Sequence, residues 1–334
     1  MFKLARNSGI SKEGMKMRIL VTGGKGFIGS HLTNYLKQKG HWVRSVDIKE
    51  KAHLDTKEDE FHCLDLRDYN NASFASKNID WIFNLAANMG GIGFITEVAA
   101  EVMHDNALVN INLMEASKVN GVKRVFFSSS ACVYNQDMQM NPTVEPLKEE
   151  HVLPANPDTF YGWEKLFTEF LMKAYHKDYG LDIRIARFHN IYGPYGTYQG
   201  GREKAPAALC RKVADAKNGE SIVIWGDGKQ TRSFLYIDDA LEAIYKLMLS
   251  NYTEPLNIGS DELISIDGLV DIIVKVSGKK LTKSYDLTKP QGVRGRNADL
   301  TLITKALEWT PRTGYKEGLA RTYRWIERMV NPKR

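Results

Sequence analysis

The sequence predicts an α/β fold in which a doubly wound, mostly parallel sheet carries a smaller, interleaved C-terminal lobe. Three observations lead to this prediction. A short apolar run near the N-terminus ends in a glycine-rich turn that opens a helical pattern. Strand and helix patterns then alternate, which is typical of a right-handed parallel sheet covered by helices on both faces. After Gly193 this alternation gives way to loops rich in Gly and Pro, so a second lobe is expected there.

The first lobe is expected over residues 17–190. Met17–Thr22 is a continuous apolar run, as in a buried parallel strand, and Phe27–Gly40 has the pattern of a helix that follows it. The strands expected after them are His41–Asp47, Phe61–Leu66, Asp80–Ala87, Arg124–Ser130 and Asp182–Phe188. The helices expected between these strands are Asn70–Ser76, His104–Asn120 and Phe160–Tyr179.

The second lobe, which we expect to bind the substrate, is predicted over residues 191–331, with some segments that return to the first lobe. Its predicted strands are short, at Ser221–Trp225 and Pro255–Ile258. Its predicted helices are Ala205–Lys217, Ile237–Leu249, Ile266–Val276 and Tyr315–Val330. Residues 1–16 are polar and basic, and we interpret them as a flexible extension.

The composition excludes several classes of protein. Of the 334 residues, 43% are hydrophobic and 26% are charged, as in an ordinary soluble globular protein. No apolar run is long enough for a membrane-spanning helix, and the basic residues behind the net charge of +6 are spread along the chain. We therefore expect neither a membrane nor a nucleic acid as a partner. Three widely spaced cysteines favour a reducing cytoplasm and argue against a disulfide framework or a bound metal.

Gly23, Gly26 and Gly29 lie between the first predicted strand and its helix. Residues without a Cβ permit a tight turn and let the backbone approach a pyrophosphate, which the helix N-terminus attracts. Asp47 ends the next predicted strand, where a carboxylate accepts hydrogen bonds from ribose hydroxyls and favours NAD over NADP. The pattern predicts a Rossmann-type NAD site, with a tight packing turn and a helix-capping Asp47 as the alternatives.

Tyr161 and Lys165 are one helical turn apart at the start of a long predicted helix, after the strand that ends at Ser130. One turn places both side chains on the same face. There the ammonium group is expected to lower the phenol pKa from its reference value of about 10. The phenolate can then take the proton from a sugar hydroxyl while hydride leaves the carbon. We therefore predict that Ser130, Tyr161 and Lys165 are catalytic.

Cys132 lies two residues after Ser130, in the same strand-end loop. A thiol there is a candidate acid or base that a simple oxidation does not require. The alternative is a small buried hydrophobic residue, the usual role of a free cysteine. The combination favours an enzyme that oxidises its substrate transiently in order to carry out a second reaction.

Taken together, these residues resemble the extended short-chain dehydrogenase/reductase family that acts on nucleotide sugars. Beside the motifs above, the resemblance is carried by Asp65-Leu66, Asn84–Ala87, Arg187–Pro194, Thr231–Phe234 and Asn257–Gly259. It implies cofactor contacts at Phe27 and Ile28 and adenine contacts at Asp65 and Leu66. It also implies a homodimer, formed through helices that include His104–Asn120 and Phe160–Tyr179.

The same resemblance implies the site that holds the substrate. Asn190 and Arg232 are expected at the diphosphate side of the nucleotide sugar, while Ser130 is expected to contact the sugar. Because hydride returns to the carbon from which it came, NAD is expected to stay tightly bound and to be recycled in each turnover.

A finer resemblance is to members that epimerise carbons 3 and 5 of a GDP-sugar. It is carried by Asn84–Phe94, Ser129–Tyr134, Gly200–Ala208, Trp225–Phe234 and Gly292–Asp299. It implies that Cys132 and Lys204 form the proton-transfer pair. The further substrate contacts that it implies are Gly90, Asn190, Lys212 and Arg296. The chemistry agrees, because a ketone at carbon 4 makes the protons on carbons 3 and 5 abstractable and Tyr161 with Ser130 can stabilise the enediolate.

Two other reactions and one non-enzymatic role are the alternatives. A nucleotide-sugar 4-epimerase needs only the Ser130, Tyr161 and Lys165 trio and has no use for the added thiol. A 4,6-dehydratase is expected to carry an Asp-Glu pair where Ala131-Cys132 stands. A non-enzymatic NAD-binding sensor is disfavoured because the catalytic trio is intact.

Overall fold

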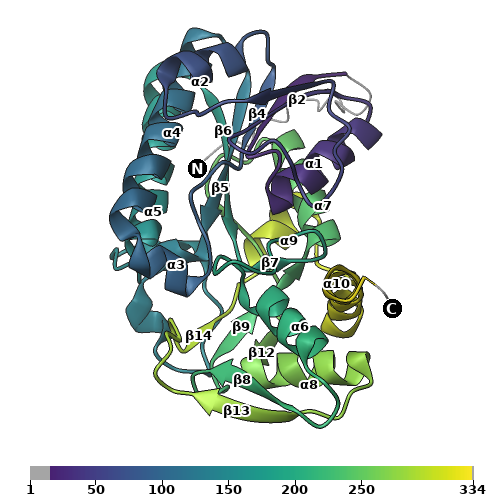
Figure 1. Cartoon of the computed structure of the whole chain (residues 1–334). Helices are drawn as coiled ribbons and strands as arrows, with labels where there is room; N and C mark the ends of the chain where they lie inside the picture. Colours follow the sequence, from purple (N-terminus) through teal and green to yellow (C-terminus); the bar gives the residue numbers. More distant parts are fainter. Residues whose placement is uncertain (1–15, 333–334) are drawn as a thin grey trace.

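The computed structural model of the protein describes residues 16–332, and a seven-stranded sheet forms its centre (Figure 1). The strand order is β11-β6-β5-β4-β1-β2-β3, and every neighbouring pair is parallel. The strands are β1 (Arg18–Thr22), β2 (Trp42–Asp47), β3 (Glu60–Cys63), β4 (Trp81–Asn84), β5 (Arg124–Ser130), β6 (Asp182–Phe188) and β11 (Leu256–Ile258).

Helices cover both faces of this sheet, so the predicted doubly wound fold is confirmed (Figure 1). The helices on one face are α1 (Phe27–Gln38), α7 (Ile237–Leu249) and α9 (Thr301–Leu307), and those on the other are α2 (Tyr69–Ser76), α4 (Ala99–Val119) and α5 (Phe160–Tyr179). Side chains alternate across β1, because Ile19 and Val21 belong to the apolar core on the first face and Leu20 to the core on the second. All three are fully buried, which explains why this strand is a continuous apolar run.

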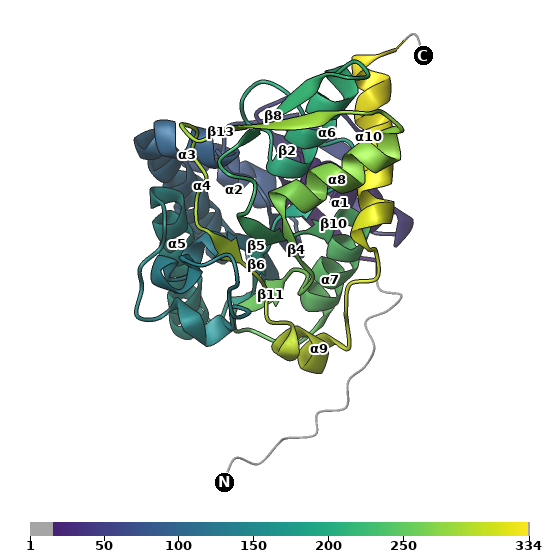
Figure 2. The ribbon, with the colours of Figure 1, turned by 90° about the horizontal axis from the view of Figure 1, so that it is seen from below.

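A second lobe packs against one end of the sheet, at the bottom of Figure 1, and Figure 2 shows this lobe from below. Its helices are α6 (Ala205–Asp215), α8 (Ile266–Ser277) and α10 (Tyr315–Val330). Its strands form three small sheets: β8 (Ser221–Trp225) with β13 (Thr282–Asp286), β7 (Ile191–Tyr192) with β10 (Leu235–Tyr236), and β12 (Leu263–Ser265) with β9 (Thr231–Ser233) and β14 (Gly295–Arg296). The strand β11 lies late in the sequence but pairs with β6 in the large sheet, which makes the two lobes interleaved.

Several predicted boundaries of strands and helices are wrong. The strand β4 ends at Asn84 rather than Ala87, and β3 ends at Cys63 rather than Leu66. The apolar residues beyond both strands leave the sheet to line a cleft, so apolar character continues where pairing stops. The helix α4 begins at Ala99, before the predicted His104, and follows an unpredicted short helix α3 (Ile92–Glu97). We interpret residues 1–16 as a flexible extension. All of them except Lys16 lie outside the described residues.

A buried ion pair joins β6 to α5 behind the carboxyl ends of the strands. Arg187 Nη2 and Glu169 Oε2 are 2.8 Å apart, and each side chain is only 3% exposed. Ser129 Oγ on β5 donates a hydrogen bond to Glu169 Oε1 at 2.5 Å. Arg187 also donates to the carbonyl oxygen of Glu149 at 2.7 Å. These contacts fix the end of β5 against α5.

Glu169→Ala is expected to lower the free energy of unfolding by about 3–5 kcal/mol, because it leaves the guanidinium of Arg187 buried and uncompensated. Lys177→Ala, at an exposed position of the same helix, is the control and should stay within about 0.5 kcal/mol of the parent protein. Urea unfolding followed by circular dichroism measures both. Equal stability of the two variants would show that the ion pair does not brace the sheet.

Candidate active site

A cleft of about 690 Å³ opens at the carboxyl ends of the parallel strands. The chain leaves β1 toward β2 and β3 on one side and returns toward β4, β5 and β6 on the other, and such a reversal is where α/β sheets bind ligands. The site residues predicted from the sequence that line this cleft are Gly23, Gly26, Phe27, Ile28, Gly29, Asp47, Asp65, Leu66, Gly90, Ser130, Tyr161, Lys165 and Lys204. The structure therefore brings the expected cofactor residues and most of the expected catalytic residues together.

The glycine turn between β1 and α1 has no room for side chains. Gly23 has a φ of +65°, and a Cβ there would lie 2.9 Å from the carbonyl oxygen of Leu85. A Cβ on Gly29 would lie 2.0 Å from the carbonyl oxygen of Gly23. The turn leads directly into the N-terminus of α1, where unpaired N–H groups favour an anion. This cradle fits the pyrophosphate of NAD.

Asp47 stands at the end of β2 on the rim of the same cleft. Its Oδ2 accepts from the backbone N–H of Lys25 at 2.9 Å and its Oδ1 from that of Lys49 at 3.0 Å. The carboxylate keeps further lone pairs that can accept from ribose hydroxyls. Asp65, by contrast, is already paired with Arg67, whose Nη2 lies 2.6 Å from Asp65 Oδ2. Asp47 therefore fits the expected ribose contact, whereas the carboxylate of Asp65 is already occupied by Arg67.

Ser130, Tyr161 and Lys165 converge from two elements. Ser130 is the last residue of β5, and Tyr161 is the second residue of α5, which begins after Thr159 accepts a hydrogen bond from Gly162 N at 3.2 Å. Lys165 follows one turn later, with its Nζ 5.5 Å from the centroid of the Tyr161 ring. Tyr161 is 6% exposed and Lys165 is 1% exposed.

Burial dominates the protonation of this pair. It raises the pKa of Tyr161 well above its usual value, and nearby negative groups, Cys132 first, add to the rise, while a hydrogen bond with Ser130 opposes it. Burial also lowers the pKa of Lys165. The net shift of the phenol pKa is therefore upward, opposite to the shift expected from the sequence, because burial dominates it.

Cys132 lies in a 3-10 turn (Ala131–Val133) that directly follows β5. Its backbone N–H donates to Ser130 Oγ at 3.2 Å. Gly162 lets α5 approach this turn, because a Cβ there would lie 2.2 Å from the carbonyl oxygen of Cys132. The side chain packs against the apolar cluster that contains Tyr161, and its Sγ accepts a hydrogen bond from Arg296 Nη1 at 3.3 Å. Cys132 therefore lies next to Ser130 and Tyr161, but it is not among the residues that line the cleft.

Lys204 is the N-cap residue of α6 and forms part of the cleft wall. Loss of hydration beside the surrounding protein lowers the pKa of its amine, and the electrostatic interaction with Cys132 raises it. The residue is nevertheless exposed to water in the open cleft.

The remaining predicted substrate residues lie outside the cleft lining. Asn190, with a φ of +46°, donates to the carbonyl oxygen of Ser233 at 3.1 Å. Arg232 donates to the carbonyl oxygen of Val293 at 2.6 Å, and Cys132 and Arg296 are close enough to influence its charge. Lys212 stands apart from the thiol.

The position of Lys212 differs from that of the other predicted substrate residues. Its Nζ donates to the carbonyl oxygen of Val223 at 2.6 Å and lies 5.6 Å from the centroid of the exposed Trp225 ring. Lys212 therefore contacts β8 and is not among the residues that line the strand-end cleft.

The sequence reasoning missed Asp158. This residue lies just before α5, and its Oδ2 is 2.8 Å from Arg296 Nη2. Gln139, also missed, accepts from Arg296 Nε. The only available signal for Asp158 was its place three residues before Tyr161, which is no motif. Its role depends on a partner that lies 138 residues away in the sequence.

Two absences hold for residues 16–332. No three His, Cys, Asp or Glu side chains in this range are placed to hold a metal ion. None of its helices is long and apolar enough to cross a membrane.

Comparisons with known proteins agree with this geometry. Residues 19–259 match the NAD dependent epimerase/dehydratase family. GDP-mannose 3,5-epimerase of Arabidopsis thaliana is 45% identical over 320 residues, which span 95% of this chain and 84% of that protein. UDP-glucose 4-epimerase of Thermotoga maritima, solved with UDP-glucose, has a TM-score of 0.86 at 27% identity and covers 94% of this chain and 100% of its own. UDP-glucuronic acid 4-epimerase of Bacillus cereus, solved with UDP-glucuronic acid and NAD, has a TM-score of 0.81 at 28% identity, with the same coverage.

His189 lies between β6 and Asn190, beneath the site, and is fully buried. Its Nε2 is 2.9 Å from Asn257 Oδ1. Burial, opposed by this hydrogen bond and aided by Arg296 and Arg187, lowers its pKa to about 3. In this environment His189 is neutral near pH 7 and acts as a packing and hydrogen-bonding residue.

Because the unfolded chain binds a proton on His189 below about pH 6.5 and the folded chain does not, acid should destabilise the fold from that pH downward. Between about pH 7.5 and pH 5 this residue should remove about 2 kcal/mol of stability. In His189→Gln that part of the pH dependence should disappear, whereas exposed His104→Gln should keep it. Urea unfolding at the two pH values measures the difference, and an unchanged pH dependence in His189→Gln would contradict the assignment.

Proposed function

The chain belongs to the NAD dependent epimerase/dehydratase family, and we propose that within it the protein acts as a GDP-mannose 3,5-epimerase. It converts GDP-mannose into GDP-L-galactose, and into GDP-L-gulose where only carbon 5 is inverted. The observation that carries this proposal is the thiol of Cys132 beside the oxidising trio, with its sulfur hydrogen-bonded to a buried arginine.

The glycine turn and Asp47 hold NAD, which, when bound, supplies a reversible hydride acceptor for carbon 4 of the sugar. Tyr161 takes the proton of the hydroxyl at carbon 4 and later returns it. Lys165 holds positive charge beneath the phenol ring, and Ser130 orients the sugar oxygen by hydrogen bonding. Because hydride returns to the same carbon, the cofactor stays tightly bound and is recycled.

Cys132 and Lys204 move the protons on carbons 3 and 5. Inversion of a carbon requires a base on one face of the sugar ring and an acid on the other. These two groups come from different lobes, Cys132 from the end of β5 and Lys204 from the start of α6. A sugar held between the lobes is therefore reached from two sides.

The second lobe holds the GDP part in this proposal, so that residues 17–190 bind NAD and residues 191–331 bind the substrate. Asn190, Arg232, Arg296 and Gly90 lie around the sugar diphosphate. Lys212 is a further substrate contact in this proposal. The three cysteines are free, which suits a reducing cytoplasm.

A 4-epimerase is the second candidate, because the solved structures named above include enzymes with that activity. Those proteins are less than 30% identical to this chain. A 4-epimerase has no use for a thiol paired with a guanidinium at the sugar. The Cys132–Arg296 contact therefore favours the 3,5-epimerase.

The helices α4 and α5 support a homodimer. Phe160, Trp163, Phe167 and Phe170 recur along one stripe of α5, and their side chains are 41–61% exposed. The neighbouring α4 adds exposed apolar residues, among them Ile111 at 39%. Such a contiguous apolar face on two adjacent helices is typical of a subunit interface. We propose that a second copy covers it.

GDP-mannose incubated with the NAD-loaded protein in deuterated water should gain deuterium at carbon 5 or at carbons 3 and 5, without added cofactor. Cys132→Ala should lower this exchange by at least about a hundredfold, because proton transfer by a positioned side chain contributes on that scale. Cys63→Ala, at the exposed cysteine, is the control. NMR of the recovered sugar nucleotide measures the exchange.

Full exchange in Cys132→Ala would remove the thiol from the mechanism. Recovery of unlabelled GDP-mannose from active parent protein, or label-free epimerisation at carbon 4 of another nucleotide sugar, would overturn the proposed function.

Phe167→Glu or Phe170→Glu should convert the dimer into a monomer, because a charge buried in an apolar interface is strongly unfavourable. Met329→Glu, at an exposed apolar residue of α10, is the control and should leave the dimer intact. Sedimentation equilibrium gives the mass. A dimer that survives both α5 substitutions would place the interface elsewhere.

A further inference from the structure

The guanidinium of Arg296 is held by three side chains in the described structure. Its Nη1 donates to Cys132 Sγ at 3.3 Å, its Nη2 to Asp158 Oδ2 at 2.8 Å, and its Nε to the side-chain oxygen of Gln139. The side chains of Arg296 and Asp158 are 7% and 10% exposed. A guanidinium has five N–H groups in a fixed plane, so three contacts from three directions fix its position and leave two donors for a substrate.

We propose that Asp158 is a positioning residue that holds the Arg296 guanidinium against the Cys132 sulfur, and thereby favours the thiolate required for proton abstraction. This inference rests on the proposed function, since it explains how the thiol serves as a base. Hydrogen bonds from a cation to a sulfur favour the charged form of the sulfur. Burial by itself opposes the charge on Arg296, but Asp158 and Cys132 more than offset it and raise its pKa.

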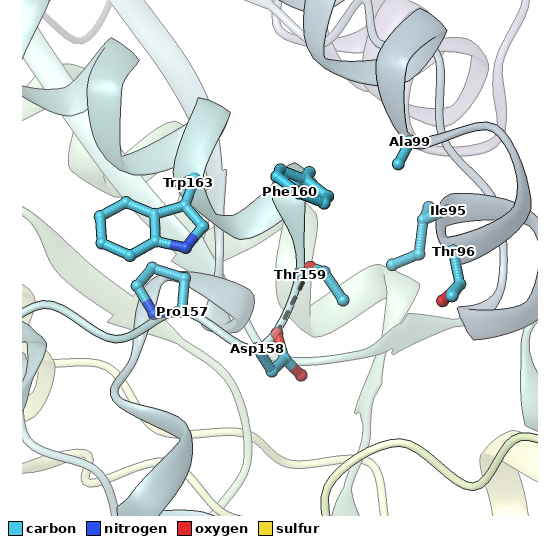
Figure 3. A pocket seen from close by; sticks show the side chains of 8 residues that line it. All are labelled: Ile95, Thr96, Ala99, Pro157, Asp158, Thr159, Phe160 and Trp163. Carbon is cyan, nitrogen blue, oxygen red and sulfur yellow. Dashed lines mark hydrogen bonds between the residues drawn. The ribbon is translucent and has the colours of Figure 1, made fainter.

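Asp158 is itself held in place on its other side. Thr159 Oγ1 donates to Asp158 Oδ1 at 3.4 Å, and this is the dashed contact in Figure 3. Both residues line a pocket of about 340 Å³ together with Ile95, Phe160 and Trp163 (Figure 3). Asp158 thus stands between this pocket and Arg296, at the N-terminus of the helix that carries Tyr161. Through Arg296, Asp158 connects the Cys132 thiol to the helix end that also carries the Tyr161 phenol.

The other charges around the thiol do not replace this contact. The charged or titratable groups that interact with Cys132 across space are Tyr161 and Lys165 from α5, Lys204 from the start of α6, Arg232 from β9 and Arg296 from β14. Among the hydrogen bonds of residues 16–332, only the one from Arg296 reaches Cys132 Sγ. The orientation of Arg296 is therefore the feature that acts directly on the sulfur.

The direction in which the reactivity of Cys132 changes distinguishes a positioning role of Asp158 from a direct effect of its charge. The carboxylate of Asp158 is negative, so its charge by itself disfavours a thiolate nearby. Removal of this charge alone would therefore make the sulfur more reactive. Loss of its hold on Arg296 has the opposite effect. Asp158→Asn keeps an oxygen that accepts from Arg296 but removes the charge, whereas Asp158→Ala removes both.

The test measures alkylation of Cys132 by iodoacetamide in NAD-loaded protein, with Cys63→Ala as background and peptide mass spectrometry as the readout. At neutral pH Asp158→Ala should react roughly tenfold more slowly, because a charge-assisted hydrogen bond is lost, and should approach the parent rate near pH 10, where thiols ionise without help. Asp158→Asn should react at least as fast as the parent, because the acceptor for Arg296 remains while the opposing negative charge is gone. Asp137→Ala, at an exposed aspartate that is hydrogen-bonded to Asn156 rather than to this network, should react as the parent does.

Arg296→Gln should slow the reaction as much as Asp158→Ala, and the double variant should be no slower than Arg296→Gln alone, because both act through one contact. An unchanged or faster rate in Asp158→Ala, equal rates in the Asn and Ala variants, or additive losses would overturn the proposal. If Asp158→Ala does not retain NAD, Asp158→Ser is judged by the same criteria. Failure of the parent protein to exchange solvent deuterium would instead overturn the proposed function, and it would leave these alkylation rates unchanged.

Discussion

The contact between the end of β5 and the first turn of α5 is the constraint on which the rest of the site depends. Gly162 permits it, since any side chain there would collide with the backbone of Cys132. One partner in the contact carries Ser130 and Cys132, and the other carries Tyr161 and Lys165. The distance between the turn that carries Cys132 and the helix end that carries Tyr161 is therefore fixed by backbone packing rather than by flexible side chains.

Two buried ion pairs support this arrangement. The Arg187–Glu169 pair and Ser129 hold β5, β6 and α5 together below the site. Arg296, which is paired with Asp158, reaches the thiol from the second lobe. Buried ion pairs add little net stability compared with apolar packing, but their loss on one side is costly. In this protein they fix orientation, and Arg296 on β14 brings the second lobe into contact with Cys132.

The sequence predicted the large sheet well because each of its strands and covering helices has a local pattern. The bounds of β5, β6, α5, α7 and α10 agree with the predicted ones. The small strands β9, β12 and β14 were not predicted, because strands of two or three residues have no periodicity to detect. They form only when distant segments meet, as when Arg296 pairs with Arg232 in register.

The candidate site also combines residues of local sequence motifs with residues that distant segments bring together. Gly23, Gly29, Asp47, Tyr161 and Lys165 belong to local motifs, and the structure gathers them in one cleft. Asp158 and Gln139 have no motif, because their role depends on a guanidinium that approaches from the far end of the chain. Burial is likewise invisible in the sequence, and it reverses the expected direction of the pKa shift of Tyr161.

The central claim is that a proton leaves a carbon next to a transient ketone while hydride returns to the carbon from which it came. GDP-mannose with deuterium at carbons 3, 4 and 5, converted in ordinary water, tests this most directly by NMR of the product. The account predicts that deuterium is lost from carbon 5, and from carbon 3 where it is inverted, and is retained at carbon 4. Retention at both carbons 3 and 5, or loss at carbon 4, would contradict it.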